Sequence, residues 1–294
     1  MSGIKNEIEN AFKQGDALTR LIFINLGVFL VYTLVSIFGY LFKIPLAGYL
    51  TSWLALPTDP FTFITRPYTL VSYMFFHEDF IHILFNLMWL YFAGRLFMEY
   101  LGGRRLLSTY LLGGLIGGLL YVVTYNVFPA FSEVVGLSNN RGASAGVMAI
   151  VIGAATFAPN LKVRLFFTLE VKLWIIAAIS VVMDLVYLSQ GNNAGGHIAH
   201  IGGAFFGYIS VSQFKKGKDL TEGFSRFMDN IVNWFKPKSK IKKVYTNTRN
   251  DENFKVRKNQ SQQRMNTILD KISKSGYDSL SKEEKEFLFK IGKD

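Results

Sequence analysis

The chain has 294 residues, half of them apolar, and a formal net charge of +11. It contains no cysteine, which excludes disulfides and thiolate metal sites. Most of the charge lies after residue 214, where 20 basic and 11 acidic side chains contribute +9. A basic balance suits nucleic acid or an anionic membrane surface. Because it stands beside long apolar blocks, we expect a lipid bilayer as partner and no nucleic acid.

Apolar residues are gathered into blocks long enough to cross a bilayer, which takes roughly 20 helical residues. After a polar head over 1–20, we predict membrane-spanning helices over 21–42, 81–99, 106–128, 143–158, 165–189 and 197–214. The loop over 43–80 contains four prolines and many aromatic residues, as is typical of the interfacial layer. The predicted fold class is all-α, a polytopic membrane protein with a six-helix bundle over 21–214.

Basic residues in the short loops predict the orientation of these helices. They gather in the head, in the turns 99–105 and 159–164, and directly after 214, whereas the alternate loops carry few. The positive-inside rule therefore places both termini in the cytoplasm. We expect a multi-pass protein of a bacterial-type inner (cell) membrane.

Polar residues that carry chemistry lie near one end of these helices. With the head inside, the second, fourth and sixth helices begin at the outer face, and each carries such residues near its start: His82 and Asn86, Ser144, and His197 and His200. A serine and histidines inside a membrane are costly to keep, so this convergence indicates a functional site that opens to the outer side.

The residue types suit nucleophilic catalysis. Ser144 lies between small residues at a helix start, where unpaired backbone N–H groups suit an oxyanion. A serine hydroxyl needs a base, and His200 is a candidate. His82 and Asn86 are four residues apart, so both lie on one helical face and can donate hydrogen bonds.

Four motifs in order resemble those of the rhomboid intramembrane serine proteases, over roughly residues 66–210. They are His77-x4-His82-x3-Asn86, the stretch Gly94 to Glu99 followed by Leu-Gly-Gly-Arg-Arg, Gly-Ala-Ser144, and Ala199-His200-x-x-Gly203. The resemblance implies a serine endopeptidase that cleaves peptide bonds in or beside transmembrane helices of membrane-protein substrates, without a cofactor or metal.

The resemblance also implies roles for single residues. Ser144 would be the nucleophile and His200 the general base, in a dyad with no third acid. His82, Asn86 and the Ser144 backbone would stabilise the oxyanion. The residues with implied structural roles near the site are His77, Gly142, Met148, His197, Gly203 and Gly207, of which the last two would let the sixth helix pack on the fourth.

The chain departs from the family pattern at three places. Ala145 stands where a glycine usually follows the serine. Met148 stands where many members carry a tyrosine that stacks on the catalytic imidazole. Tyr68-Thr69 occupies the place of a Trp-Arg pair in the first loop.

Three other functions can be weighed against the serine endopeptidase from the residues themselves. A catalytically inactive relative would bind or escort membrane proteins, but such relatives generally lack the serine or the histidine. A zinc motif in His77-Glu78-x3-His82 has the wrong spacing, because zinc helices use histidines four apart. A transporter is suggested by Asp184 in the fifth helix, although a protonated, hydrogen-bonded contact between helices would also explain this residue, and no inverted repeat with broken helices is evident. The oligomeric state is left open.

The tail differs in character from the rest of the chain. Residues 215–262 are predicted as a basic linker, with nine basic and two acidic residues over 236–258. Residues 263–294 are predicted as a small cytoplasmic helical hairpin. Its apolar face is Ile268, Leu269 and Ile272, and Ser281 with Glu284 forms a capping box.

Overall fold

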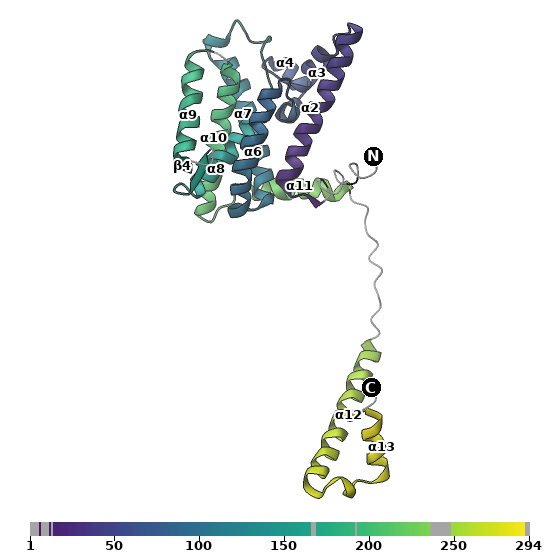
Figure 1. Cartoon of the computed structure of the whole chain (residues 1–294). Helices are drawn as coiled ribbons and strands as arrows, with labels where there is room; N and C mark the ends of the chain where they lie inside the picture. Colours follow the sequence, from purple (N-terminus) through teal and green to yellow (C-terminus); the bar gives the residue numbers. More distant parts are fainter. Residues whose placement is uncertain are drawn as a thin grey trace. The chain divides into compact units, whose positions relative to one another are not determined.

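The computed structural model describes residues 14–165, 169–191, 193–235 and 248–291, together with Asn6 and Phe12. The chain divides into two compact units, Met1–Lys236 and Pro237–Asp294, each with helices of its own (Figure 1). Most of the expected polar head, and residues 236–247 of the expected linker, lie outside the described residues.

Within the described part of the first unit, six helices form a bundle and lie side by side in Figure 1. They are α2 (Ala17–Phe42), α6 (Phe80–Leu101), α7 (Gly103–Val127), α8 (Ser144–Phe157), α9 (Leu173–Ser189) and α10 (Ala194–Lys215). Each overlaps one of the six helices expected from the apolar blocks. Three of them, α2, α6 and α7, are long and apolar enough to cross a membrane, while α8 and α9 are apolar but shorter.

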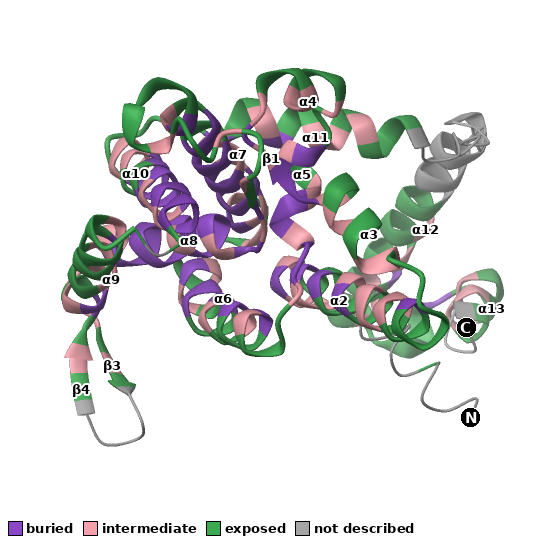
Figure 2. Cartoon of the chain, turned by 90° about the horizontal axis from the view of Figure 1, so that it is seen from above, coloured by how far each residue is buried: buried purple, intermediate pink, exposed green. Residues whose placement is uncertain are grey.

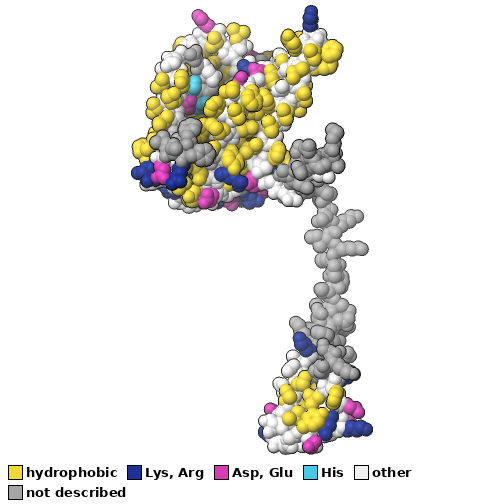
Figure 3. Space-filling view, viewed as in Figure 1, with side chains coloured by type: hydrophobic (Ala, Val, Ile, Leu, Met, Phe, Trp, Pro, Cys, Tyr) yellow, Lys and Arg dark blue, Asp and Glu magenta, His cyan; other side chains and the backbone are white. Residues whose placement is uncertain are grey.

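The outside of the bundle is apolar, as a surface in contact with lipid must be. Hydrophobic side chains cover its flank in Figure 3, and charged side chains gather at the end where α6 turns into α7. On α2, for example, Leu34 is 66% exposed and Leu41 is 68% exposed. In water such a surface would be an aggregation hazard, so the flank is suited to hydrocarbon.

The core of the bundle lies between α7, α8 and α10, where buried residues concentrate in Figure 2. Ten of the 14 residues of α8 are buried. Glycines allow the close approach of α10, since a Cβ at Gly203 would lie 2.0 Å from the Ala145 carbonyl oxygen and one at Gly207 would lie 2.2 Å from that of Ala149. Small residues at such contacts are what helix packing in membranes requires.

Short helices and strands lie in the loops between the long helices. They are α3 (Leu46–Leu54), β1 (Leu56–Pro57), α4 (Pro60–Thr65), α5 (Thr69–Ser72), η1 (Tyr73–Phe75), η2 (Pro129–Phe131) and β2 (Asn139–Asn140). Strand β1 pairs with β2 in antiparallel register, which ties the long first loop to the loop before α8. The buried Tyr73 hydroxyl donates to the Gly114 carbonyl at 2.6 Å and fixes η1 on α7.

The fifth helix begins later than expected, at Leu173 instead of 165, and the fold is mostly rather than wholly helical. Before it, β3 (Lys162–Leu165) and β4 (Leu169–Lys172) form an antiparallel hairpin. The physical reason is an alternation of charged and apolar residues with a period of two, which favours strands. Across the hairpin Arg164 pairs with Glu170 at 3.1 Å.

The interval 215–262, expected to be a linker, contains helical structure. α11 (Glu222–Phe235) lies across the end of the bundle in Figure 1 and is attached to α7. The Ser108 and Ser225 hydroxyls share a buried hydrogen bond of 2.7 Å, and Arg104 pairs with Asp229 at 2.6 Å. The high charge of the interval as a whole favoured a linker, but the residues of α11 repeat with the period of an amphipathic helix.

The second unit is a pair of helices, α12 (Thr248–Ser275) and α13 (Lys282–Ile291), joined through η3 (Tyr277–Ser279). α12 begins well before 263 because no proline or glycine interrupts the chain until Gly276. Ile268 and Leu280 are buried between the elements. The predicted capping box is present: the Ser281 N–H donates to the Glu284 carboxylate at 2.8 Å, and the Glu284 N–H donates to the Ser281 hydroxyl at 3.3 Å.

Candidate active site

Ser144 is the first residue of α8, and the two residues before it are held from outside the helix. The Gly142 N–H donates to the Tyr73 carbonyl at 2.8 Å, and the Ala143 N–H donates to His77 Nε2 at 3.2 Å. Gly142 has φ +117°, a conformation that favours glycine. The first N–H groups of α8 have no partner within the helix and no side-chain cap, so they are available to an anion.

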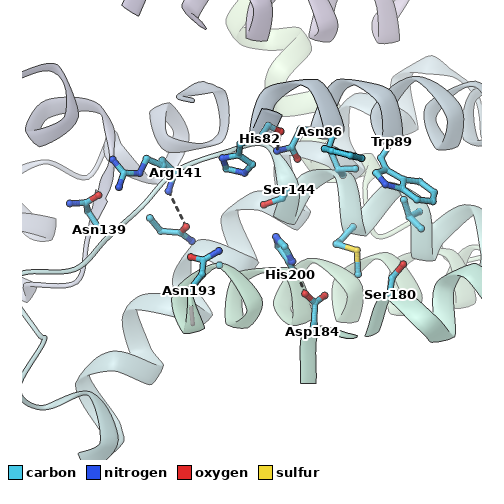
Figure 4. A pocket seen from close by; sticks show the side chains of 16 residues that line it. His82, Asn86, Trp89, Asn139, Arg141, Ser144, Ser180, Asp184, Asn193 and His200 are labelled. Atoms are coloured by element: carbon cyan, nitrogen blue, oxygen red, sulfur yellow. Dashed lines mark hydrogen bonds and ion pairs between the residues drawn. The ribbon is translucent and has the colours of Figure 1, made fainter. Parts of the chain in front are cut away.

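A cavity of about 500 Å³ connects the candidate residues. Ser144 from α8, His200 from α10, and His82 and Asn86 from α6 all line it. In Figure 4 the Ser144 hydroxyl and the His200 imidazole face each other across this space. The structure therefore brings together four residues that lie up to 118 positions apart in the chain.

His200 is held by an acid from the neighbouring helix. Its Nδ1 lies 2.8 Å from the Asp184 Oδ1 on α9, and the Nδ1 of His197 lies 2.8 Å from the same oxygen. His197 does not line the cavity; its ring is stacked on Tyr187 with centroids 5.4 Å apart. Of the two histidines of α10, only His200 therefore faces Ser144.

His82 and Asn86 lie in the first two turns of α6. The Asp79 side chain caps this helix by accepting from the His82 N–H at 2.7 Å. The Asn86 amide donates to the His82 carbonyl at 3.0 Å, which leaves a second amide proton for the cavity. The His82 ring packs against Gly142, where a Cβ would lie 2.6 Å from His82 Cε1.

Comparison with known proteins identifies the family to which the chain belongs. Residues 65–214, half of the chain, match the family model of the Rhomboid domain. The chain belongs to the rhomboid family. Its C-terminal residues 249–292 match a family of unknown function, DUF6576.

A curated relative of this rhomboid is the RHOMBOID-like protein 12, mitochondrial, of Arabidopsis thaliana. The two are 28% identical over 161 residues, which cover 52% of this chain and 48% of the plant protein. The rhomboid thus spans about half the length of this relative.

Several cavity residues of the rhomboid were not singled out from its sequence. Arg141 forms an ion pair with Glu78 beside the cavity, and Asn140 and Asn193 contribute amides. Their signal was weak, because polar residues in loops are common. Met148, by contrast, was expected near the site in the place of a stacking tyrosine, and it lines the cavity.

The family resemblance implied a dyad with no acid, yet Asp184 contacts both histidines of α10. The sequence contained a signal for it, since a lone carboxylate in an uncharged apolar helix needs a partner from another helix. Sequence reasoning linked Asp184 either to a transporter or to a hydrogen-bonded contact between helices, but nothing local shows which face of the fifth helix it occupies or which side chain it meets.

Asp184, His197 and His200 of the rhomboid are also near enough to be considered as metal ligands, with ligand atoms within 4.8 Å of one another. Their spacing fits hydrogen bonds better. Ligands about 2.0–2.1 Å from a tetrahedral zinc ion lie roughly 3.3 Å apart, whereas Asp184 Oδ1 lies 2.8 Å from each Nδ1.

Proposed function

We propose that this rhomboid is an intramembrane serine endopeptidase that cleaves peptide bonds in or beside transmembrane helices of its substrates. The single observation that carries the proposal is the meeting of Ser144 and His200, from different helices, at one cavity lined with hydrogen-bond donors. A nucleophile, a base and donors for an oxyanion are the parts that acyl transfer needs.

The reaction follows from these positions. His200 Nε2 takes the proton from the Ser144 hydroxyl as its oxygen attacks the substrate carbonyl carbon. The tetrahedral oxyanion is stabilised by His82, Asn86 and the N–H groups at the start of α8. His200 then gives the proton to the leaving amine, and the peptide bond breaks to leave an acyl-enzyme. Water, deprotonated by His200, hydrolyses the ester and releases Ser144.

The lengths of the helices support a site recessed below the outer surface. α8 has 14 residues and is therefore about 21 Å long, against about 30 Å for the hydrocarbon core. Its first residue, Ser144, would lie below the headgroups. His200 is the seventh residue of α10, about 9 Å from that helix's start, which matches this depth.

For the membrane arrangement, we propose six spans, α2 and α6 to α10, with both termini in the cytoplasm of a cell with a bacterial-type inner membrane. The basic turn at Arg104 and Arg105 supports this orientation. The C-terminal unit would then be a cytoplasmic module, and the cavity would open to the outer side.

The substrate class follows from where the site lies. A peptide bond in a transmembrane helix has its carbonyl engaged in a hydrogen bond, so the helix must unwind locally before Ser144 can attack. Substrates with small or helix-weak residues near the cleaved bond are therefore favoured.

The test uses purified protein in detergent or nanodiscs, incubated with transmembrane-helix reporters and with a fluorophosphonate probe. We expect cleavage and labelling of the wild type, and neither from Ser144→Ala or His200→Ala with an unchanged melting temperature. Cleavage by purified Ser144→Ala would reject the proposal. A folded wild type that neither cleaves nor reacts would favour the alternative, a catalytically inactive protein that binds or escorts membrane proteins.

A further inference from the structure

Asp184 is an unusual residue for its helix. α9 is in contact with the rest of the bundle along a narrow strip, and only Leu173, Ile176 and Asp184 of its residues are buried. Asp184 is 6% exposed, in an otherwise uncharged helix. A carboxylate in such a place is costly unless it is hydrogen-bonded. The Asp184 side chain therefore makes a specific polar interaction with the bundle and does not serve only to fill space.

That interaction is with the imidazoles of α10. The Asp184 Oδ1 lies 2.8 Å from His200 Nδ1 and 2.8 Å from His197 Nδ1. One carboxyl oxygen can donate at most one proton, so at least one imidazole donates its Nδ1–H to Asp184. With the carboxylate ionised, both imidazoles donate, and each then keeps a lone pair on Nε2.

The geometry assigns Asp184 as the positioning residue of His200, an inference that rests on the proposed function. By accepting from Nδ1–H it holds His200 in the tautomer whose Nε2 is unprotonated, and it holds the ring so that Nε2 faces the cavity and Ser144. Without this partner, His200 can rotate or carry its proton on Nε2, where it cannot accept a proton from the serine.

The protons balance without any transfer to Asp184. When Nε2 takes the Ser144 proton, His200 becomes an imidazolium with protons on both nitrogens. The carboxylate stays ionised and stabilises that charge through the hydrogen bond it already makes, as the acid of a Ser-His-Asp triad does.

His197 completes the arrangement. Its ring stands at 84° to that of His200, with centroids 5.7 Å apart, and it approaches the same carboxylate oxygen from the outer turn of α10. It shares the carboxylate but does not reach the cavity. We therefore infer that His197 holds the Asp184 carboxylate in place and does not act as a second base.

The first measurement does not depend on activity. The chain has four histidines, so ¹⁵N-histidine NMR of the protein in nanodiscs gives few resonances, and His200→Gln identifies those of His200. We expect His200 protonated on Nδ1 and unprotonated on Nε2 in the wild type, and a shift of the proton to Nε2 in Asp184→Ala. A wild-type His200 protonated on Nε2 would overturn the inference, whether or not Asp184→Ala folds.

The second measurement is kinetic. Asp184→Asn should lower kcat at least tenfold, and by up to about 10⁴-fold if Asp184 acts as fully as a triad acid, with KM within twofold of the wild type. Asp184→Glu, which keeps the carboxylate, should recover part of kcat. If Asp184 had a purely structural role, both variants would instead have a lower melting temperature, and the kcat of Asp184→Glu would not lie between those of Asp184→Asn and the wild type.

The matched control is Ser189→Ala on the same helix, whose exposed hydroxyl donates to the Val186 carbonyl at 2.7 Å and which does not line the cavity. It should keep wild-type kcat. Folded Asp184→Asn with unchanged kcat would overturn the inference while leaving the proposed function intact. If the wild type itself neither cleaves nor labels, the proposed function fails, and the NMR result alone then supports or overturns the role of Asp184 in holding His200.

Discussion

His77 accepts a hydrogen bond at 3.2 Å from the backbone N–H of Ala143, the residue directly before Ser144. His77 is fully buried and lies 66 positions earlier in the chain. It therefore orients the turn that leads into α8 without reaching the cavity. A structural role was expected for His77, and this hydrogen bond shows what the role is: His77 holds the backbone of Ala143.

Replacing His77 tests the importance of the bond. His77→Ala leaves the buried Ala143 N–H without an acceptor, which should lower the free energy of unfolding by about 1–3 kcal/mol. It should also slow fluorophosphonate labelling of Ser144, because the turn before it is released. His77→Gln, which offers an amide oxygen, should recover part of both. Equal labelling rates for wild type and His77→Ala would contradict the role.

The same residue predicts a dependence of stability on pH. Burial, together with the nearby His82, lowers the pKa of His77 to about 4. Because the pKa of a free histidine is about 6.5, protonation favours the unfolded chain. The stabilisation is complete above about pH 6.5 and is lost as the pH falls toward 4. The melting temperature of the wild type should therefore fall more steeply over this range than that of His77→Gln. Parallel curves would contradict the prediction.

A small change at a helix contact should disable the site from a distance. The Cβ introduced by Gly203→Ala would lie 2.0 Å from the backbone oxygen of Ala145, so α8 and α10 must move apart. We expect a loss of about 1–3 kcal/mol in stability and at least a tenfold fall in labelling of Ser144. The control Gly27→Ala in α2, where nothing lies within 4 Å, should match the wild type. Similar behaviour of the two variants would argue against a tight α8–α10 contact.

Removal of Asn86, a proposed oxyanion donor, should affect the transition state more than substrate binding. Asn86→Ala removes the amide that faces the cavity from α6. Loss of one such donor typically costs about 10²–10³ in kcat, so we expect a fall of this size with little change in KM. Steady-state kinetics on a helix reporter measure both. A change in KM alone would place Asn86 in substrate binding instead.

Chelation should leave the activity unchanged. Asp184, His197 and His200 are spaced for hydrogen bonds and not for a metal, since the Asp184 oxygen lies 2.8 Å from both nitrogens. If the protein cleaves the helix reporter as proposed, we expect its kcat in the presence of EDTA to remain within twofold of the value without EDTA. A loss of activity that added Zn²⁺ restores would show that these side chains hold an ion.

Much of the bundle could be predicted because the evidence for it is local. An apolar block of suitable length predicts a helix wherever it folds, and all six expected helices overlap α2 and α6 to α10. The failures are local as well. An alternating pattern before Leu173 was included in a helix although it forms a hairpin, and the charge after 214 hid α11.

From the sequence alone it was possible to name Ser144, His200, His82 and Asn86, because motif spacing and the order of apolar helices bring them to one end of a bundle. The tertiary structure alone decided that Asp184 meets His200 and that His77 meets Ala143. Such contacts join side chains of different elements, and they depend on how each helix is rotated and how closely its neighbours approach. At Gly203 and Gly207 that approach is set by contacts between backbones, which the spacing of residues along one helix does not reveal.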